Sequence, residues 1–255
     1  TLALAVGDVV EVDGRVVENG RGLELPVTEL DVWGALVLRR GEPLPEPVRL
    51  GQGGRALPTI LGELAADPFA PASGAHGFFE SLEGMRVRID GAVVVGPTST
   101  FGDVAVLPDG GDGFAPRTRR GGLALRPESG FPGCLVVDDW IVPDPPALTV
   151  GDRLARPVVG LVDSAFGAWR VLNTEPLGAV EPSGLGPERT TLARDADHLV
   201  VATLNVENLS ARSDDAKLAA AAATIVDHLG APDVVALQEI QDDSGPDDDG
   251  TVSAA

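Results

Sequence analysis

Two oxygen-bearing side chains near the end of the sequence could do metal chemistry. Asn205 follows the apolar run Leu199–Leu204, and Glu239 follows a second run, Asp233–Leu237. A carboxylate and a carboxamide held together suit a hard cation such as Mg²⁺, which takes oxygen ligands and leaves room for phosphate. Alternatively, Glu239 is a solvated carboxylate at a strand end and Asn205 forms a turn. Residue types and spacing leave both interpretations open.

The elements around these residues predict where they lie. Both apolar runs are short and partly β-branched, which is typical of buried strands. The segment Asp214–Leu229 between them is predicted to be a helix, with Ser213 as its N-cap and Gly230 at its end. The predicted apolar face of this helix comprises Leu218, Ala222, Ile225 and Leu229.

A strand, a helix and a second strand form a βαβ unit with a right-handed crossover and parallel strands. The carboxyl ends of both strands then share one edge, which is where open α/β sheets bind ligands. We therefore expect Asn205 and Glu239 to lie side by side at that edge.

The sequences of these segments resemble those of a known family. LNVENL, then DVVALQEI some thirty residues later, then QDDSGPDDDGTVSA, are similar to the start of the endonuclease/exonuclease/phosphatase family, in its secreted bacterial nuclease form. The resemblance implies a two-sheet α/β sandwich and metal-dependent hydrolysis of phosphodiester bonds in nucleic acid. It implies catalytic roles for Asn205 and Glu239 and assigns both to the site of Mg²⁺ (or Mn²⁺ or Ca²⁺), with Glu239 as a metal ligand. Asn208 and Gln241 are then expected to bind substrate.

The same resemblance sets an expectation about activity. In that family the general acid and base histidines, and further Asp and Asn ligands, come from later strands. The histidines of this sequence, at 76, 198 and 228, do not fall on those positions. We therefore expect only the start of the catalytic domain here, inactive without the remainder. Secretion is likewise expected from the resemblance alone.

Composition narrows the class of protein. The 255 residues include 32 Gly and 21 Pro, which favours many turns and a mainly β fold. A net charge of −20 counts against a simple DNA-binding protein but is compatible with an enzyme that uses a metal. Lys217 is the only lysine, which we interpret as compositional bias, and Cys134, the only cysteine, is predicted to be a core residue. No apolar run reaches membrane-spanning length, and we expect a monomer.

The first two thirds of the sequence contains a repeat. GDVVEVDGRVV at 7–17 and GMRVRIDGAVV at 84–94 are identical at six of eleven positions, with a weaker echo from Val150. Alternating apolar and polar residues predict equivalent strands, and the internal Gly suggests a bend or bulge. SAFG, between Val162 and Ala168, predicts a hairpin turn. Regular short strands of this kind favour a small barrel or sandwich.

This part, roughly residues 5–175, also resembles the OB-type β-barrel region that precedes the catalytic domain in secreted bacterial nucleases. The similar segments are FFESLEGMRVRIDGAVVV, FGDVAVLPD, VGDRL and FGAWRVL. We predict a first OB-like region at 1–75, a second β region at 76–180, a linker at 181–197 and the start of the catalytic domain at 198–255.

Candidate ligand-binding residues in this part are tryptophans that could stack on bases and arginines that could track phosphates. They are Trp33, Trp140, Trp169, Arg39, Arg40 and the RTRR cluster with Arg117, Arg119 and Arg120. The alternative is that the tryptophans pack in the core and the arginines lie on solvated turns. Two other functions therefore remain: an OB-type module that binds nucleic acid or glycan without catalysis, and a β protein without a ligand.

Overall fold

The computed structural model describes residues 3–20, 25–62, 73–114, 117–124, 133–192 and 195–250. The prediction of a mainly β fold is confirmed, because strands hold 36% of the residues and helices 11%. Contacts divide the chain into two compact units, Thr1–Leu185 and Gly186–Ala255. Within the described ranges, no helix has both the length and the apolar character needed to cross a membrane.

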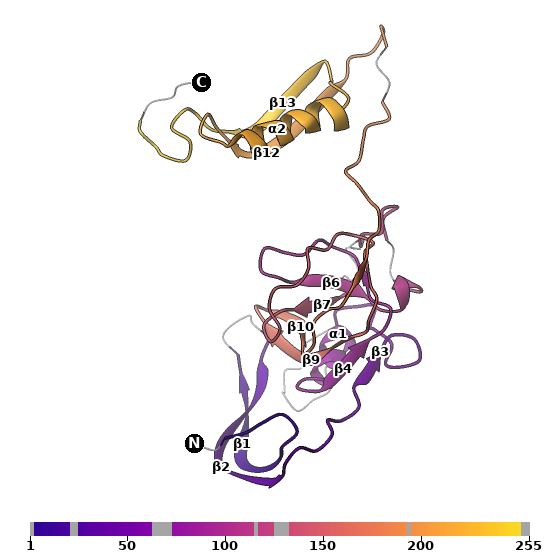
Figure 1. Ribbon diagram of the computed structural model, residues 1–255, viewed down its shortest axis with the longest axis vertical. Helices are drawn as coiled ribbons and strands as arrows, with labels where there is room; N and C mark the ends of the chain where they lie inside the picture. Colours follow the sequence, from indigo (N-terminus) through magenta and orange to yellow (C-terminus); the bar gives the residue numbers. More distant parts are fainter. Residues whose placement is uncertain are drawn as a thin grey trace. The chain divides into compact units, whose positions relative to one another are not determined.

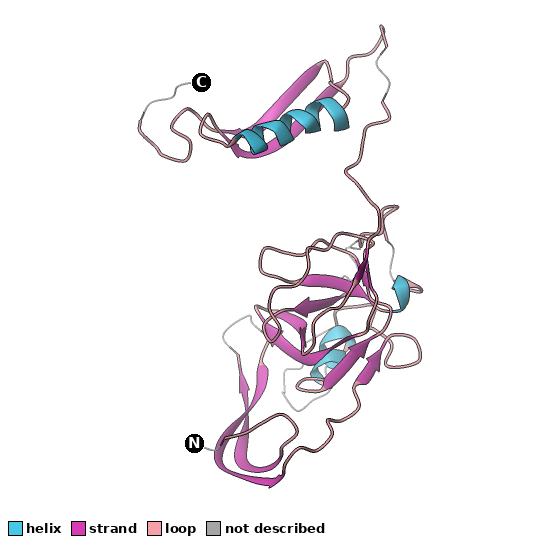
Figure 2. Ribbon diagram, viewed as in Figure 1, coloured by secondary structure: helices cyan, strands magenta, loops and turns pink. Residues whose placement is uncertain are grey.

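The first unit is built on a nine-stranded mixed sheet (Figures 1 and 2). Its spatial order is β11-β8-β5-β6-β7-β10-β9-β4-β3. The pairs β3–β4 and β7–β10 are parallel and the others antiparallel. The strands are β3 (Val48–Leu50), β4 (Arg86–Ile89), β5 (Val93–Val94), β6 (Val104–Leu107), β7 (Leu135–Asp138), β8 (Arg153–Leu154), β9 (Val158–Ala165), β10 (Ala168–Asn173) and β11 (Val180–Glu181). A helix, α1 (Gly74–Glu80), and a 3₁₀ turn, η1 (Asp109–Gly111), complete the unit.

The core of this unit follows from the two-residue period of its strands. β9 and β10 alternate strictly between buried and half-buried residues, so one face of each strand packs inward. Trp169 on β10 stacks on Phe79 of α1, with ring centroids 5.9 Å apart. Of the three tryptophans, only Trp169 is therefore a core residue, whereas Trp33 and Trp140 are 71% and 83% exposed.

No sheet closes into a barrel in the part of the chain that is described. Among the described strands, none pairs with the outer sides of the two end strands of the large sheet, β11 and β3. The coarse prediction of a β-rich body therefore holds, and the barrel stays a prediction.

The two copies of the repeat form strands, but not equivalent ones, so that expectation is wrong. The first copy runs through β1 (Val9–Asn19), which pairs with β2 (Val27–Arg39) in a separate two-stranded sheet. The second copy is split between β4 and β5, which pair with different neighbours in the large sheet.

The shared Asp-Gly pair explains this difference. Gly91 has φ of 56°, a left-handed conformation that glycine adopts readily, and it turns the chain between β4 and β5. Gly14 stays within β1 at a register shift, where its backbone approaches Asp31 so closely that a Cβ would lie 2.8 Å from the Asp31 carbonyl oxygen. One dipeptide therefore makes a corner in one copy and a bulge in the other.

The second unit contains the predicted βαβ arrangement. β12 (Val201–Leu209) pairs in parallel with β13 (Val234–Ile240), and the connection holds α2 (Asp215–Ala223), which continues as one π-helical turn, η2 (Thr224–His228) (Figure 1). The predicted strands and helix are confirmed, with shifted ends. The predicted N-cap is wrong: Asp214 caps α2, accepting a hydrogen bond from the Lys217 backbone N–H at 2.7 Å.

Two details of burial in this unit also differ from the predictions. The strands are mostly exposed rather than buried, with Val201 66% and Val234 50% exposed. On α2, Leu218 is 42% exposed and Ala222 is also exposed, while Ala221 and Thr224 are half-buried against the β12 side. One helix covers only one face of a two-stranded sheet, so the other apolar side chains stay in contact with water.

Cys134 is expected to react slowly with thiol reagents in the native protein. It directly precedes β7 and packs against a small cluster of Val93, Val95 and Leu107, in line with its predicted core role. Burial raises the pKa of its thiol to about 11. Because only the thiolate reacts, labelling at pH 8 should be on the order of a hundredfold slower than for an exposed thiol. Ellman's reagent with and without urea measures this, and fast labelling of the native chain would contradict it.

Candidate functional site

The parallel pairing brings the two predicted site residues into direct contact. Asn205 lies opposite Gln238 in the register of β12 and β13. Its side-chain Nδ2 donates a hydrogen bond of 2.6 Å to Oε1 of Glu239. The prediction that Asn205 and Glu239 lie side by side on a parallel pair is therefore confirmed. Their roles in binding a metal stay predictions.

A bulge in β12 makes this contact possible. Between the pairs Asn205–Gln238 and Leu209–Ile240, three residues of β12 oppose only Glu239 of β13. Glu207, Asn208 and Glu239 have φ of 52°, 61° and 56°, left-handed conformations that cost about 1–2 kcal/mol each for residues with side chains. Asn205 supports the bulge, because its Oδ1 accepts a hydrogen bond of 2.8 Å from the Glu207 backbone N–H.

A second polar pair lies beside the first. Gln241 donates through Nε2 to Oδ1 of Asn208 at 3.2 Å, and its backbone N–H donates to the Leu209 carbonyl at 2.9 Å. The two residues expected to bind substrate are therefore adjacent across the same strands as Asn205 and Glu239. The four side chains form what we call the strand-edge site: Asn205, Asn208, Glu239 and Gln241.

Lys217 is a site residue that the sequence interpretation missed. Its ammonium group donates to the Glu207 carbonyl at 2.5 Å, which ties the first turn of α2 to the bulge. With Asn205 and Thr224 it lines a shallow pocket of about 170 Å³ between β12 and α2. Lys217 is the only lysine in the sequence, and the other fixed positive charges are arginines. This was the sequence signal that could have identified it as a site residue.

The candidate ligand atoms of the strand-edge site are of the chemical type that a hard cation binds. All its candidate ligands are oxygens: the Glu239 carboxylate, one oxygen of which accepts from Asn205, and the amide oxygens of Asn205 and Asn208. Within the described ranges, no three Asp, Glu, His or Cys side chains gather into a metal-binding group. Mg²⁺ commonly takes only one or two protein carboxylates and keeps several waters, so a single carboxylate is compatible with it.

The histidines lie elsewhere. His198 precedes β12 at the end opposite to Asn205, and its Nδ1 lies 2.7 Å from Asp195, a hydrogen bond that lowers the pKa of that carboxyl. His228 is the last residue of η2, and His76 is on α1 of the first unit. Among the described residues of the second unit, no histidine therefore joins the strand-edge site.

The predicted arginine cluster belongs to the first unit. Arg117 forms an isolated bridge with Leu123, on either side of the turn that holds Arg119 and Arg120. Arg39, the last residue of β2, pairs with Glu42 at 3.1 Å, and Arg40, just after β2, pairs with Asp8 at 2.9 Å.

A comparison with protein families gives a match to most of the first unit. Residues 49–182 match the family described as Domain of unknown function (DUF8508), and this match covers more than half of the chain. The chain belongs to the DUF8508 family. The DUF8508 match spans nearly the whole nine-stranded sheet and stops before the strand-edge site. Comparisons with curated proteins and with solved structures gave no match.

Proposed function

We propose that the second unit carries the metal-binding edge of a magnesium-dependent nuclease or related phosphodiesterase. The observation that supports this most is the hydrogen bond between Asn205 and Glu239 across a parallel strand pair. The resemblance of LNVENL and DVVALQEI to the endonuclease/exonuclease/phosphatase family joins the same two residues. The proposal includes a two-sheet α/β sandwich that begins with this βαβ unit, and secretion of the protein as a monomer.

The residues of the strand-edge site have distinct parts in this proposal. Glu239 holds the cation, and Asn205 orients the Glu239 carboxylate or a phosphate oxygen. Asn208 and Gln241, already fixed against each other, contact the nucleic acid substrate. A bound Mg²⁺ supplies charge that stabilises the phosphoryl oxygens as water attacks. Lys217 keeps the bulge in place, so that these groups do not have to be ordered when substrate binds.

The metal-binding role predicts a difference between two carboxylates close together in the sequence. Mn²⁺, a paramagnetic stand-in for Mg²⁺, is expected to broaden NMR signals around Asn205 and Glu239. Glu239→Gln should weaken this effect by about tenfold or more, since removing even an outer-shell partner costs 10–100-fold. Asp242→Asn removes the same charge three residues away and is expected to change little.

Asp242 is a matched control because its Oδ1 accepts from the backbone N–H and hydroxyl of Ser244, bonds that the amide oxygen of asparagine retains. Equal losses in the two variants, or broadening centred on the acidic segment 242–249, would reject Glu239 as the metal ligand.

The 255-residue chain itself is expected to show no magnesium-dependent cleavage of DNA or RNA. General acid–base catalysis contributes about 10²–10⁴-fold, and no described histidine of the second unit belongs to the strand-edge site. A fluorogenic oligonucleotide assay should give the same background for the unaltered chain and for Glu239→Ala. Robust cleavage that Glu239→Ala abolishes would show that this chain already contains a complete active site.

The second candidate function is an OB-like binding module in the first unit, without catalysis. The exposed Trp33 and Trp140 favour it, because exposed aromatic rings stack on bases or sugars. This candidate requires metal-independent binding of an oligonucleotide or glycan that Trp140→Ala weakens. The nuclease proposal instead requires metal binding that Glu239→Gln weakens, so the two measurements distinguish the candidates.

A further inference from the structure

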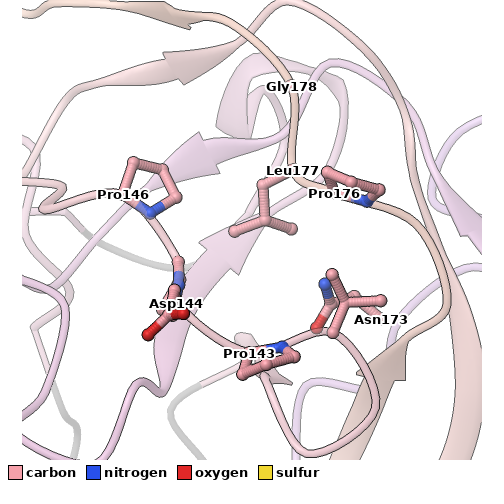
Figure 3. A pocket seen from close by; sticks show the side chains of 9 residues that line it. Pro143, Asp144, Pro146, Asn173, Pro176, Leu177 and Gly178 are labelled. Carbon is pink, nitrogen blue, oxygen red and sulfur yellow. The ribbon is translucent and has the colours of Figure 1, made fainter.

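A pocket in the DUF8508 region has the features of a ligand site (Figure 3). The loop Pro143–Pro146, which follows β7, borders one side, and Pro176 and Leu177, which follow β10, border the other. Its volume is about 300 Å³, at the lower end of the range for small-molecule pockets. It belongs to the first unit and shares no residue with the strand-edge site.

Asn173 supplies an unusual polar group at this pocket. It is the last residue of β10 and continues the inward-facing series of Trp169 and Val171, with only 3% of its surface exposed. Its Nδ2 donates to the Glu175 carbonyl at 3.0 Å, and because a carbonyl can only accept, this bond fixes the orientation of the amide. Oδ1 is then a buried acceptor with no hydrogen-bond partner among the described residues. Such a group costs free energy that an incoming donor would recover.

The side chains of the other lining residues carry no hydrogen-bond donor. Four of the lining residues are prolines, at 143, 145, 146 and 176, and proline has no backbone N–H. Of the described lining residues, only Asp144 carries a charge, and its carboxylate is exposed at the rim. The side chains of the pocket therefore present apolar ring surfaces, one buried acceptor and one anionic acceptor.

The rim also contains a strained residue. Asp144 has φ of 63°, a left-handed conformation that is unfavourable for a residue with a side chain. Oδ1 of Asn173 is shielded from water, so a ligand reaches it only through a small shift of the pocket wall. Relaxation of the strained rim on binding would favour that shift.

We propose that this pocket binds a small organic amine. The ammonium group donates a hydrogen bond to Oδ1 of Asn173 and pairs with Asp144, while the apolar body packs against the proline rings and Leu177. The net charge of −20 favours the approach of such a cation over that of an anion. This site is independent of the proposed nuclease function.

The test is an NMR titration of the full chain with phenethylamine, 2-phenylethanol and phenylacetate. These share an aromatic body and carry a cationic donor, a neutral donor and an anion. Phenethylamine is expected to bind most tightly and to shift signals of 142–146 and 173–178, and phenylacetate is expected not to bind. Asn173→Leu, which keeps the volume but removes the acceptor, should weaken phenethylamine binding by about tenfold, since a hydrogen bond to a charged group is lost.

Two further variants keep the proposal falsifiable if Asn173→Leu fails to fold. Asp144→Asn at the exposed rim should weaken phenethylamine binding, and Asp31→Asn, which removes one charge from the exposed hairpin, should not. Equal affinity for phenethylamine and 2-phenylethanol, or equal binding by Asp144→Asn and the unaltered chain, would overturn the assignment of an amine. If none of the three compounds shifts the NMR signals of the pocket residues, the cavity holds only water, and the proposal is also overturned.

Discussion

Replacing Arg170 by alanine is expected to lower the free energy of unfolding by about 3–5 kcal/mol, because it leaves two largely buried carboxylates without their cation. Arg170 lies on β10 and its side chain is only 12% exposed. Its guanidinium group forms ion pairs with Asp138 at 2.6 Å and with Asp103, whose side chains are 13% and 23% exposed. It also lies over the Phe166 ring, 5.4 Å from its centroid. One side chain thus connects β10 to the end of β7 and the start of β6.

Arg15 provides the matched control. It pairs with Asp31 at 3.5 Å on the β1–β2 hairpin, where the two side chains are 69% and 62% exposed. Water screens such a pair, so Arg15→Ala should change stability by less than about 1 kcal/mol. Urea unfolding of both variants at pH 7 measures the difference. Similar losses for the two would mean that the Arg170 cluster is as well solvated as a surface pair.

The second large effect is expected at Asp152, which lies just before β8 and is 5% exposed. Its Oδ2 accepts from the Thr149 backbone N–H at 2.8 Å, and its Oδ1 accepts from the Ser183 backbone N–H at 2.7 Å. Asp152→Ala leaves both donors without their carboxylate acceptor in a partly buried setting. We expect a loss of about 2–4 kcal/mol in the free energy of unfolding, at roughly 1–3 kcal/mol for each orphaned group.

Asp152 also predicts the direction of a pH effect. The hydrogen bond from Thr149, assisted by that from Ser183, lowers the pKa of Asp152 in the folded chain. A lowered folded pKa stabilises the protein above the unfolded value of about 3.9, and this stabilisation is lost as the pH falls through the folded value. Unfolding free energies between pH 5 and pH 2 should therefore fall less steeply in Asp152→Asn than in the unaltered chain. Identical slopes would show that other carboxylates carry the acid sensitivity.

Features set by neighbouring residues were predictable from the sequence. The hairpin at SAFG is present, with β9 and β10 pairing on either side of Phe166 and Gly167. The βαβ unit was predictable for the same reason, because alternating runs, a helix of suitable length and Gly230 all act over a short range.

Features set by distant residues were not predictable. Arg170 meets Asp103 and Asp138 from 67 and 32 residues away, and no local pattern marks that meeting. The order of the nine strands, with β7 parallel to β10, depends on the same long-range packing. The repeat led to the wrong prediction of equivalent strands because the Asp-Gly pair is compatible with both a corner and a bulge. The strands that pair with each copy determine which of the two forms.

At the strand-edge site, the sequence indicated which residues meet but not how. Parallel pairing alone places Asn205 opposite Gln238, and the contact with Glu239 requires left-handed conformations at Glu207, Asn208 and Glu239. Residues with side chains rarely adopt such conformations, so sequence patterns do not indicate them. The bulge therefore became visible only in the folded chain.

Because of the position of Lys217, proteolysis can be used to measure the folding of the second unit. An endoproteinase specific for lysine has one cleavage site in this sequence, after Lys217, and the cut separates β12 from β13. The scissile bond lies in the first turn of α2, where the Leu218 backbone N–H is bonded to the Asp214 carbonyl at 3.2 Å. Cleavage must wait until that turn opens, so its rate reports the opening equilibrium of the helix. A ligand that binds the closed unit would slow the cut, which makes digestion a direct reporter of occupancy at the strand edge.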